Sequence, residues 1–268
     1  QYKGGAELTT HAITSLSKNP IKMINCQSLT KQFILKHKDC EWVICNFSQL
    51  TDENKITICK NTSYSIIEYD YKFCKYRSMQ KHFAAEKKEC DCVEKKDSKI
   101  NLIFYGYAKR LWFMSAQQMN IFLNKVKTIK RNKCCVLSSV FSPGDLKFME
   151  SIKDNQKNNK YLILKSDSWI KGTQEAIHFA KKNNLQFELV SGLQYHEMLI
   201  KMSTSKGLIF RPLGSDTCPR IVIEAMLLNC DLVLNDNVQH KDEPWFANRE
   251  TCASYLRKNI ETFWNFYE

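Results

Sequence analysis

The chain has 268 residues, of which 43% are hydrophobic and 12% aromatic, so it can form a packed globule and wholesale disorder is excluded. No window reaches the ~18 consecutive apolar residues of a membrane span, and no signal-peptide pattern opens the sequence. The net charge of +12 suits polyanionic partners: nucleotide diphosphates, the anionic face of a membrane, or nucleic acid.

Twelve cysteines are scattered along the chain. Without a secretory signal they indicate reduced thiols in a cytoplasmic protein rather than a disulfide framework. Cys90 and Cys92, with Cys74 and His82 nearby, form the only group whose composition suits a metal. Because the group lacks a C-x2-C pair, the spacing favours plain thiols over zinc, and we expect no metal.

The first half predicts one α/β domain, residues 1–142. Gly4 and Gly5 open a Gly-rich loop that enters a helix, and paired glycines let a backbone approach a ligand closely. Apolar runs predict strands at 42–47, 55–59, 65–69, 102–105, 110–114 and 134–137, with a helix at 117–127 and a charged surface excursion at 78–99. The Phe141-Ser142-Pro143-Gly144 stretch is the clearest break in the chain, and we expect the domain to end there.

The second half, residues 143–268, alternates more regularly. Strands are expected at 161–164, 187–190, 207–210 and 232–234, helices at 174–182, 195–202 and 220–228, and an amphipathic helix at 255–266. Strands separated by helices of this length indicate parallel βαβ units. Ligands of such sheets bind beyond the carboxyl ends of the strands, where the loops 166–171 and 211–219 are expected to lie.

Residues 210–226, F-R-P-L-G-S-D-T-C-P-R-I-V-I-E-A-M, are the most informative segment. A strand ends near Pro212, a polar loop follows, and Pro219 opens a helix, where its missing N–H costs nothing. The backbone N–H groups before and at the helix start favour a phosphate. They belong to Thr217, Cys218 and Arg220, and Pro219, which has no N–H, lies among them.

Two carboxylates flank these amides. Asp216 lies in the loop, and Glu224 lies inside the helix, leaning back toward its N-terminus. This arrangement suits a nucleotide-sugar, with the sugar hydroxyls at Asp216, the diphosphate at the amides and the ribose hydroxyls at Glu224. The alternative is an ordinary strand-loop-helix turn with a solvated Asp and a surface Glu.

The same segment resembles the signature of retaining family 4 glycosyltransferases, P-S-x-x-E-x-x-P-x-x-x-x-E-A-M-A-x-G. The positions in register are Pro212, Pro219, Glu224, Ala225 and Met226; Asp216 stands for the first Glu and Asn229 for the late Gly. The resemblance implies an α/β chain of GT-B fold, with two Rossmann-like domains facing a central cleft and a C-terminal helix packing back.

The resemblance also implies an activity. The chain would be a metal-independent glycosyltransferase that needs no further cofactor. It would move a sugar, with retention, from a donor such as a UDP- or GDP-sugar to a glycan, lipid or protein acceptor. The leaving diphosphate would be stabilised electrostatically and would itself take the acceptor's proton.

The resemblance assigns roles to four further segments. Gly4-Gly5-Ala6-Glu7 is similar to a G-G-A-E loop that faces the donor phosphates from the opposite domain; a strand normally precedes it, so we expect residues ahead of Gln1. Lys171, in a Lys-Gly pair, would contact the diphosphate, with Ser166 in place of the usual Arg. Leu193 falls at the turn where the backbone reads the nucleobase.

Tyr69 stands where the family often has the His of an H-D-Y strand end, with Asp70 and Tyr71 in register. Its phenol can donate or accept a hydrogen bond with a sugar hydroxyl, but it keeps its own proton at neutral pH and so does not act as a general acid or base. The alternative at this position is an aromatic strand edge packed on a helix.

Two other functions stay open on the sequence. A catalytically weak nucleotide-sugar-binding module is consistent with Tyr69, Ser166 and Asp216 in place of the family's residues. A basic nucleic-acid-binding α/β protein is consistent with the charge, but no helix-turn-helix, zinc finger or aromatic-basic strand supports it, and we expect no nucleic acid. Peripheral contact with an anionic membrane is also consistent with the charge.

Overall fold

The computed structural model describes residues 4–267, which divide into two compact units. The first-half unit comprises residues 18–138, and the second-half unit comprises residues 139–267 together with the N-terminal stretch up to Ser17. The division after Ser138 lies close to the predicted boundary at 142–143. It differs from the prediction at the front of the chain, because the first helix belongs to the second-half unit.

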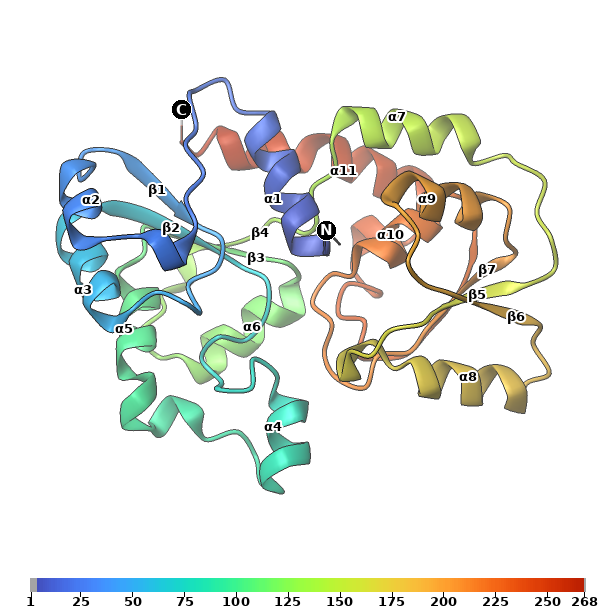
Figure 1. Cartoon of the computed structure of the whole chain (residues 1–268), viewed down its shortest axis with the longest axis horizontal. Helices are drawn as coiled ribbons and strands as arrows, with labels where there is room; N and C mark the ends of the chain where they lie inside the picture. Colours follow the sequence, from blue (N-terminus) through green and yellow to red (C-terminus); the bar gives the residue numbers. More distant parts are fainter. Residues whose placement is uncertain (1–3, 268) are drawn as a thin grey trace. The chain divides into compact units, whose positions relative to one another are not determined.

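The first-half unit is built on a four-stranded parallel sheet of order β1-β2-β3-β4 (Figure 1). The strands are β1 (Glu41–Ile44), β2 (Ser63–Glu68), β3 (Arg110–Phe113) and β4 (Cys134–Val136); the helices are α2 (Lys31–Lys36), α3 (Asp52–Asn61), α4 (Met79–Glu86), α5 (Lys99–Tyr107) and α6 (Ala116–Lys125). Ile66 pairs with Ile44 on one side and Leu111 on the other. These residues and the rings of Phe104 and Phe122 are buried in one core.

Two strands predicted in this unit are wrong. Residues 55–59 lie in α3, because the Thr51 side chain accepts a hydrogen bond from the Asn54 amide and caps a helix there. Residues 102–105 lie in α5, where Phe104 is buried but Ile103 faces solvent. A run of four apolar residues does not distinguish a buried strand from one face of a helix.

The second-half unit holds the other parallel sheet, of order β6-β5-β7-β8. Its strands are β5 (Tyr161–Leu164), β6 (Phe187–Val190), β7 (Gly207–Phe210) and β8 (Asp231–Leu234); its helices are α1 (Gly5–Ser15), α7 (Pro143–Ile152), α8 (Thr173–Lys182), α9 (Tyr195–Ser203), α10 (Arg220–Leu227) and α11 (Arg249–Trp264). In Figure 1, α8 covers one face of this sheet while α9 and α10 lie on the other. The predicted elements of this half are confirmed, and α7 is an addition.

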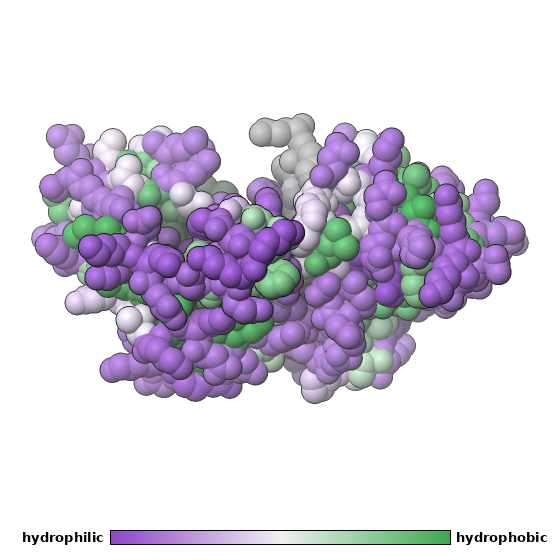
Figure 2. Space-filling model, turned by 90° about the horizontal axis from the view of Figure 1, so that it is seen from below, coloured by the Kyte–Doolittle hydropathy of each residue, from purple (hydrophilic) through white to green (hydrophobic). Residues whose placement is uncertain are grey.

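The surface is predominantly polar. Figure 2 shows a mostly hydrophilic face on which apolar residues occur in scattered patches. No helix within residues 4–267 is both long and apolar enough to span a bilayer.

Candidate functional site

The strand order of the second-half unit creates a switch point between β5 and β7. From β5 the chain crosses to β6 on one side, then returns to β7 on the other side of β5. The loops that follow β5 and β7 therefore diverge at the same edge of the sheet. In parallel α/β sheets this is where ligands bind. The two loops that carry the predicted residues Lys171 and Asp216 both start at this edge.

The loop after β5 ends in a short 3-10 turn, η5 (Trp169–Lys171), followed by Gly172. Gly172 has φ of +62°, which links η5 to the start of α8. A Cβ at Gly172 would lie 1.9 Å from the carbonyl oxygen of Arg211, so only glycine fits this contact. Gly172 thus brings the loop after β5 directly against the loop after β7.

The loop after β7 is anchored by the segment that follows β8. The side-chain amides of Asn235 and Asn237 donate hydrogen bonds to the Pro212 carbonyl, at 2.9 and 2.8 Å. The backbone N–H of Asp216 donates to the Asn237 carbonyl at 2.8 Å, and the Gln239 N–H donates to the Asp216 carbonyl at 3.1 Å. These bonds fix the backbone of Asp216 and leave its side chain to interact elsewhere.

Lys171 and Asp216 form an ion pair across the two loops. Lys171 Nζ lies 2.9 Å from Asp216 Oδ2 and 5.6 Å from the centre of the Phe210 ring. The two side chains keep 31% and 13% of their surface exposed, so the pair is accessible from solvent. The structure therefore brings together two residues that the sequence assigned separately to the diphosphate and the donor sugar.

The start of α10 lies directly beyond Asp216. Thr217 and Cys218 are buried, and Pro219 is the N-cap of the helix, which begins at Arg220. The Ser139 hydroxyl donates to the Cys218 carbonyl at 2.9 Å and so fixes this turn. Burial raises the pKa of Cys218 to about 12, so its thiol stays neutral.

Arg220 and Glu224 form a second, enclosed ion pair. Arg220 Nε lies 3.4 Å from Glu224 Oε1, and both side chains are more than nine-tenths buried. The guanidinium stacks 3.8 Å from the Phe141 ring centre and donates to the Val140 carbonyl and, at 3.1 Å, to the Tyr195 hydroxyl. Burial raises the pKa of Glu224, while Arg220 opposes that change.

Glu224 is enclosed, which differs from the surface Glu of the alternative interpretation of this segment. The sequence placed Glu224 within reach of a ribose, and here its carboxylate faces Arg220. Tyr195 and Phe141, which complete this enclosure, were not identified from the sequence. Nor were Asn235 and Asn237, although an N-D-N stretch directly after a strand is a recognisable polar signal at the carboxyl edge.

Gly4 and Gly5 lie at the start of α1 in the second-half unit, whereas the sequence placed them in the opposite domain. Gly4 is the N-cap, and a Cβ at Gly5 would lie 3.5 Å from Arg220 Cδ. The glycine pair thus allows the helix start to approach the stem of Arg220. Leu193 is exposed after β6, next to Gly192 with φ of +73°.

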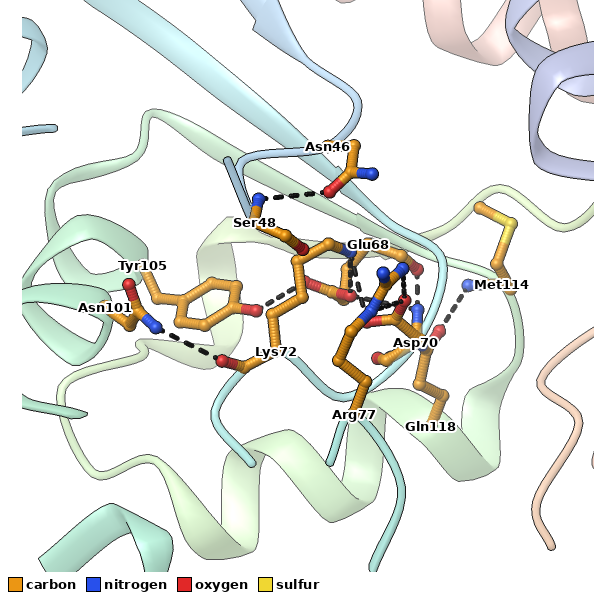
Figure 3. A network of polar contacts seen from close by, with 10 residues as sticks. All are labelled: Asn46, Ser48, Glu68, Asp70, Lys72, Arg77, Asn101, Tyr105, Met114 and Gln118. Atoms are coloured by element: carbon orange, nitrogen blue, oxygen red, sulfur yellow. Dashed lines mark hydrogen bonds and ion pairs between the residues drawn. The ribbon is translucent and has the colours of Figure 1, made fainter. Parts of the chain in front are cut away.

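Tyr69 follows β2 in the first-half unit and is partly exposed. Its neighbours belong to a dense polar network at the carboxyl end of β2, shown in Figure 3. Lys72 Nζ lies 2.7 Å from Glu68 Oε1 and 3.2 Å from Asp70 Oδ1. Tyr105 donates to the other oxygen of Glu68, and Arg77 pairs with Asp70.

Glu68 and Lys72 are almost completely buried, whereas Arg77 keeps about half of its side-chain surface exposed. Burial raises the pKa of Glu68 to about 7, although Lys72 opposes the change. For Asp70, burial alone would raise the pKa, but Lys72 and Arg77 outweigh it and the pKa is lowered. The sequence did not identify Glu68 or Lys72, because a Glu inside an apolar strand and a Lys four residues later give no motif.

Comparisons with known proteins show the fold. No family model matches the chain, and no curated protein matches it in sequence. Among solved structures, HepE (Alr3699) of Anabaena, in complex with UDP and glucose, is similar with a TM-score of 0.52 at 9% identity; 88% of this chain and 80% of that chain are covered. An apo structure of OtsA is similar with a TM-score of 0.51 at 11% identity, covering 86% and 67% of the two chains.

These likenesses agree with two α/β units that each contain a parallel sheet. The expected fold class is therefore confirmed: the chain is an α/β protein of the GT-B type.

Proposed function

We propose that the second-half unit binds the diphosphate of a nucleotide-sugar at the carboxyl edge of β5 and β7, and that the chain is a retaining glycosyltransferase of the family 4 type. The observation that carries this proposal is the Lys171–Asp216 ion pair, set at the switch point of the sheet and directly before the start of α10. The complex of HepE with UDP and glucose supports the class of donor.

The ion pair is suited to exchange. A partly exposed pair is weakly held, because water and salt screen both charges. An incoming diphosphate offers Lys171 a stronger, doubly charged partner, and the positive N-terminus of α10 favours the same negative charge. Lys171 then stabilises the negative charge of the leaving group, and the freed Asp216 carboxylate accepts hydrogen bonds from the sugar hydroxyls.

The enclosed Arg220–Glu224 pair contributes a second positive charge to this site. Arg220 is fixed at the first residue of α10, so its positive charge adds to that of the helix N-terminus. Glu224 holds it there, and we assign the Glu224 carboxylate to the ribose hydroxyls of the donor. Transfer then proceeds without a protein base, with the leaving phosphate taking the acceptor's proton. We assign Leu193 to nucleobase contact.

A nucleotide-sugar-binding module without turnover is the second candidate. It is favoured by one observation, the enclosure of Glu224 under Phe141 and Tyr195, which a donor must open before it meets the carboxylate. The acceptor of the transferase is a glycan, lipid or protein.

The test has two stages and uses the full chain. Thermal shift against UDP, GDP, ADP and their sugars identifies the nucleotide, and the transferase and the module both predict a shift with one of them. Release of the nucleoside diphosphate from the matching donor, with the configuration of the sugar product read by NMR, then separates them. A retained α-linked product supports the transferase, binding without release supports the module, and no shift with any nucleotide contradicts both.

A further inference from the structure

A second site of a different kind lies in the first-half unit, around three cysteines that the sequence analysis assigned to plain thiols and the nearby His82. We propose that Cys74, His82, Cys90 and Cys92 bind a structural Zn²⁺ ion. One ligand atom from each of these residues lies within 4.8 Å of all the others, and all four side chains are buried. The proposal is independent of the nucleotide-sugar site.

The distances within the cluster match tetrahedral zinc. With Zn–S of about 2.3 Å and Zn–N of about 2.0 Å, a tetrahedral ion holds its sulfur and nitrogen ligands roughly 3.5 Å apart. His82 Nδ1 lies 3.7 Å from Cys74 Sγ and 3.5 Å from Cys92 Sγ. Three thiolates and one imidazole are a ligand set typical of structural zinc sites, and a soft sulfur-rich set selects zinc over magnesium or calcium.

The four ligands come from three separate segments, so proximity along the chain alone does not explain their convergence. Cys74 follows β2, His82 lies on α4, and Cys90 and Cys92 follow that helix in the chain, with Cys92 opening the 3-10 turn Cys92–Glu94. The sequence spacing alone did not predict this site, because one residue separates Cys90 from Cys92, whereas zinc-binding cysteine pairs usually have at least two residues between them. The fold supplies the missing ligands by bending the excursion back on itself.

Helix α4 buries little of its own surface, although Met79 packs against the core and Tyr76 donates a hydrogen bond to Glu86. It is eight residues long, and His82 is its only buried side chain. Phe83 on the same helix is about half exposed. Helices this short are unstable in water unless tertiary contacts hold them. A bound metal would provide that contact through the one side chain that α4 buries.

Surrounding charges complement the ion and its ligands. Zn²⁺ with three thiolates and a neutral imidazole carries a net charge of −1. Lys88 and Lys95 lie near this region, because their Nζ atoms pair with Asp91 Oδ2 at 3.1 and 2.9 Å. His82 Nε2, the nitrogen not facing the sulfurs, is buried without a hydrogen-bond partner and lies 4.0 Å from Asp91 Oδ1. Metal-bound histidines commonly direct this second nitrogen at a carboxylate.

The site would also hold the polar network of Figure 3 in place. Cys74 lies two residues after Lys72 and three before Arg77, and both of these side chains pair with Asp70. Arg77 has φ of +57°, a conformation that non-glycine residues adopt only when their surroundings enforce it. A metal ion bound by Cys74, which lies between Lys72 and Arg77 in the sequence, would provide that constraint.

The test is the metal content of the untagged full chain, purified from cells grown with added zinc and measured by inductively coupled plasma mass spectrometry. The matched variants are Cys90→Ser and His82→Gln, with Cys40→Ser, an exposed cysteine outside the cluster, as control. We expect one zinc ion per chain in wild type and in Cys40→Ser, and loss of most of the zinc in Cys90→Ser and His82→Gln. Substitution of wild type with Co²⁺ should give the visible bands of tetrahedral thiolate coordination.

The measurement on wild type decides the question even where a site variant fails to fold. A folded wild-type chain without stoichiometric zinc, and without tetrahedral cobalt bands, would overturn the proposal. So would full zinc content in folded Cys90→Ser and His82→Gln, which would place the ion elsewhere. A disulfide among these cysteines in protein kept under reducing, zinc-replete conditions would also refute it.

Discussion

The ion pairs Lys171–Asp216 and Arg220–Glu224 differ in how much their loss would lower the free energy of unfolding. Lys171–Asp216 is accessible to water, so its net contribution to stability is small, about 0–1 kcal/mol. Arg220–Glu224 is enclosed, and loss of one partner would leave the other charge buried, at a cost of about 3–5 kcal/mol. The first pair is therefore free to change partners, whereas the second also holds the structure together.

Substitution of the two acids should separate these roles. Asp216→Ala is expected to leave the melting temperature nearly unchanged and to slow sugar transfer with little effect on nucleotide affinity. Glu224→Ala is expected to weaken nucleotide binding and to lower the free energy of unfolding by about 3–5 kcal/mol, since Arg220 loses its partner. Urea unfolding, titration calorimetry and donor turnover measure the three quantities. Identical kinetics and affinity in wild type and both variants would refute the assignment.

Lys72 gives a similar test in the first-half unit. Lys72→Met removes the buried partner of Glu68, so we expect a loss of about 3–5 kcal/mol near pH 8. The folded-state pKa of Glu68 is already raised to about 7, and it rises further without Lys72. A protonated Glu68 is neutral, so the loss should shrink as the pH falls below 7.

The control for Lys72 is Lys109→Met, which removes an exposed pair with Glu41 and should cost less than about 1 kcal/mol at every pH. Urea unfolding of the three proteins between pH 5 and 8 gives the comparison. A Lys72→Met deficit that is small, or independent of pH, would show that Glu68 and Lys72 do not interact as a buried pair.

At the scale of elements, the loops at the carboxyl edge are set by particular backbone conformations. Gly172 and Gly192 both have positive φ, after β5 and β6 respectively. A Cβ at Gly172 would collide with the Arg211 backbone, whereas a Cβ at Gly192 meets nothing within 4 Å. The first glycine therefore holds two loops together, and the second only allows a turn.

Alanine at these two positions should have unequal effects. Gly192→Ala carries the strain of a positive φ alone, about 1–2 kcal/mol. Gly172→Ala adds the collision with Arg211, so we expect a larger loss of stability together with weaker nucleotide binding, because Lys171 precedes it. Thermal unfolding and calorimetry check both. Equal effects of the two substitutions would mean that the loops do not meet as described.

The segment after β8 contains a buried histidine. His240 is enclosed between Trp245 and Phe246, with ring centres 5.4 and 4.6 Å away, and neither ring nitrogen has a hydrogen-bond partner. Burial lowers its pKa to about 3. The unfolded chain takes up a proton near the usual value of about 6.5, so His240 destabilises the folded state increasingly as the pH falls from 6.5 toward 3.

His240→Phe should remove this part of the acid sensitivity. Relative to wild type, the variant is expected to lose less stability between pH 7 and 4, while the exposed-site control His178→Asn should follow wild type. Urea unfolding across this range measures the difference. Parallel stability curves for wild type and His240→Phe would contradict the buried, neutral state of His240.

The sequence predicted the second-half unit far better than the first. In the second half, strands and helices have different lengths and alternate, so periodicity identified β5–β8 and α8–α10. In the first half, the short apolar runs at 55–59 and 102–105 were ambiguous, and helix capping by Thr51 decided the first of them. Asp216 and Lys171 were found through a motif, but their pairing depends on strand order, which no local pattern contains.

For the whole molecule, the net charge of +12 is the feature with the widest range of interpretations. Several lysines and arginines are already engaged in specific pairs, as at Lys72, Lys171 and Arg220. Of these three, only Lys171 is accessible to solvent, and it lies at the carboxyl edge of a parallel sheet, where such folds bind small ligands. This placement is the reason that a diphosphate-linked donor is preferred over nucleic acid as the partner.

The most direct test of this account is a crystal structure of the full chain with the nucleoside diphosphate that stabilises it most. We predict the pyrophosphate beside Lys171 Nζ and the first amides of α10, with the Lys171–Asp216 ion pair opened. A nucleotide bound elsewhere on the chain, with that ion pair intact, would contradict the account.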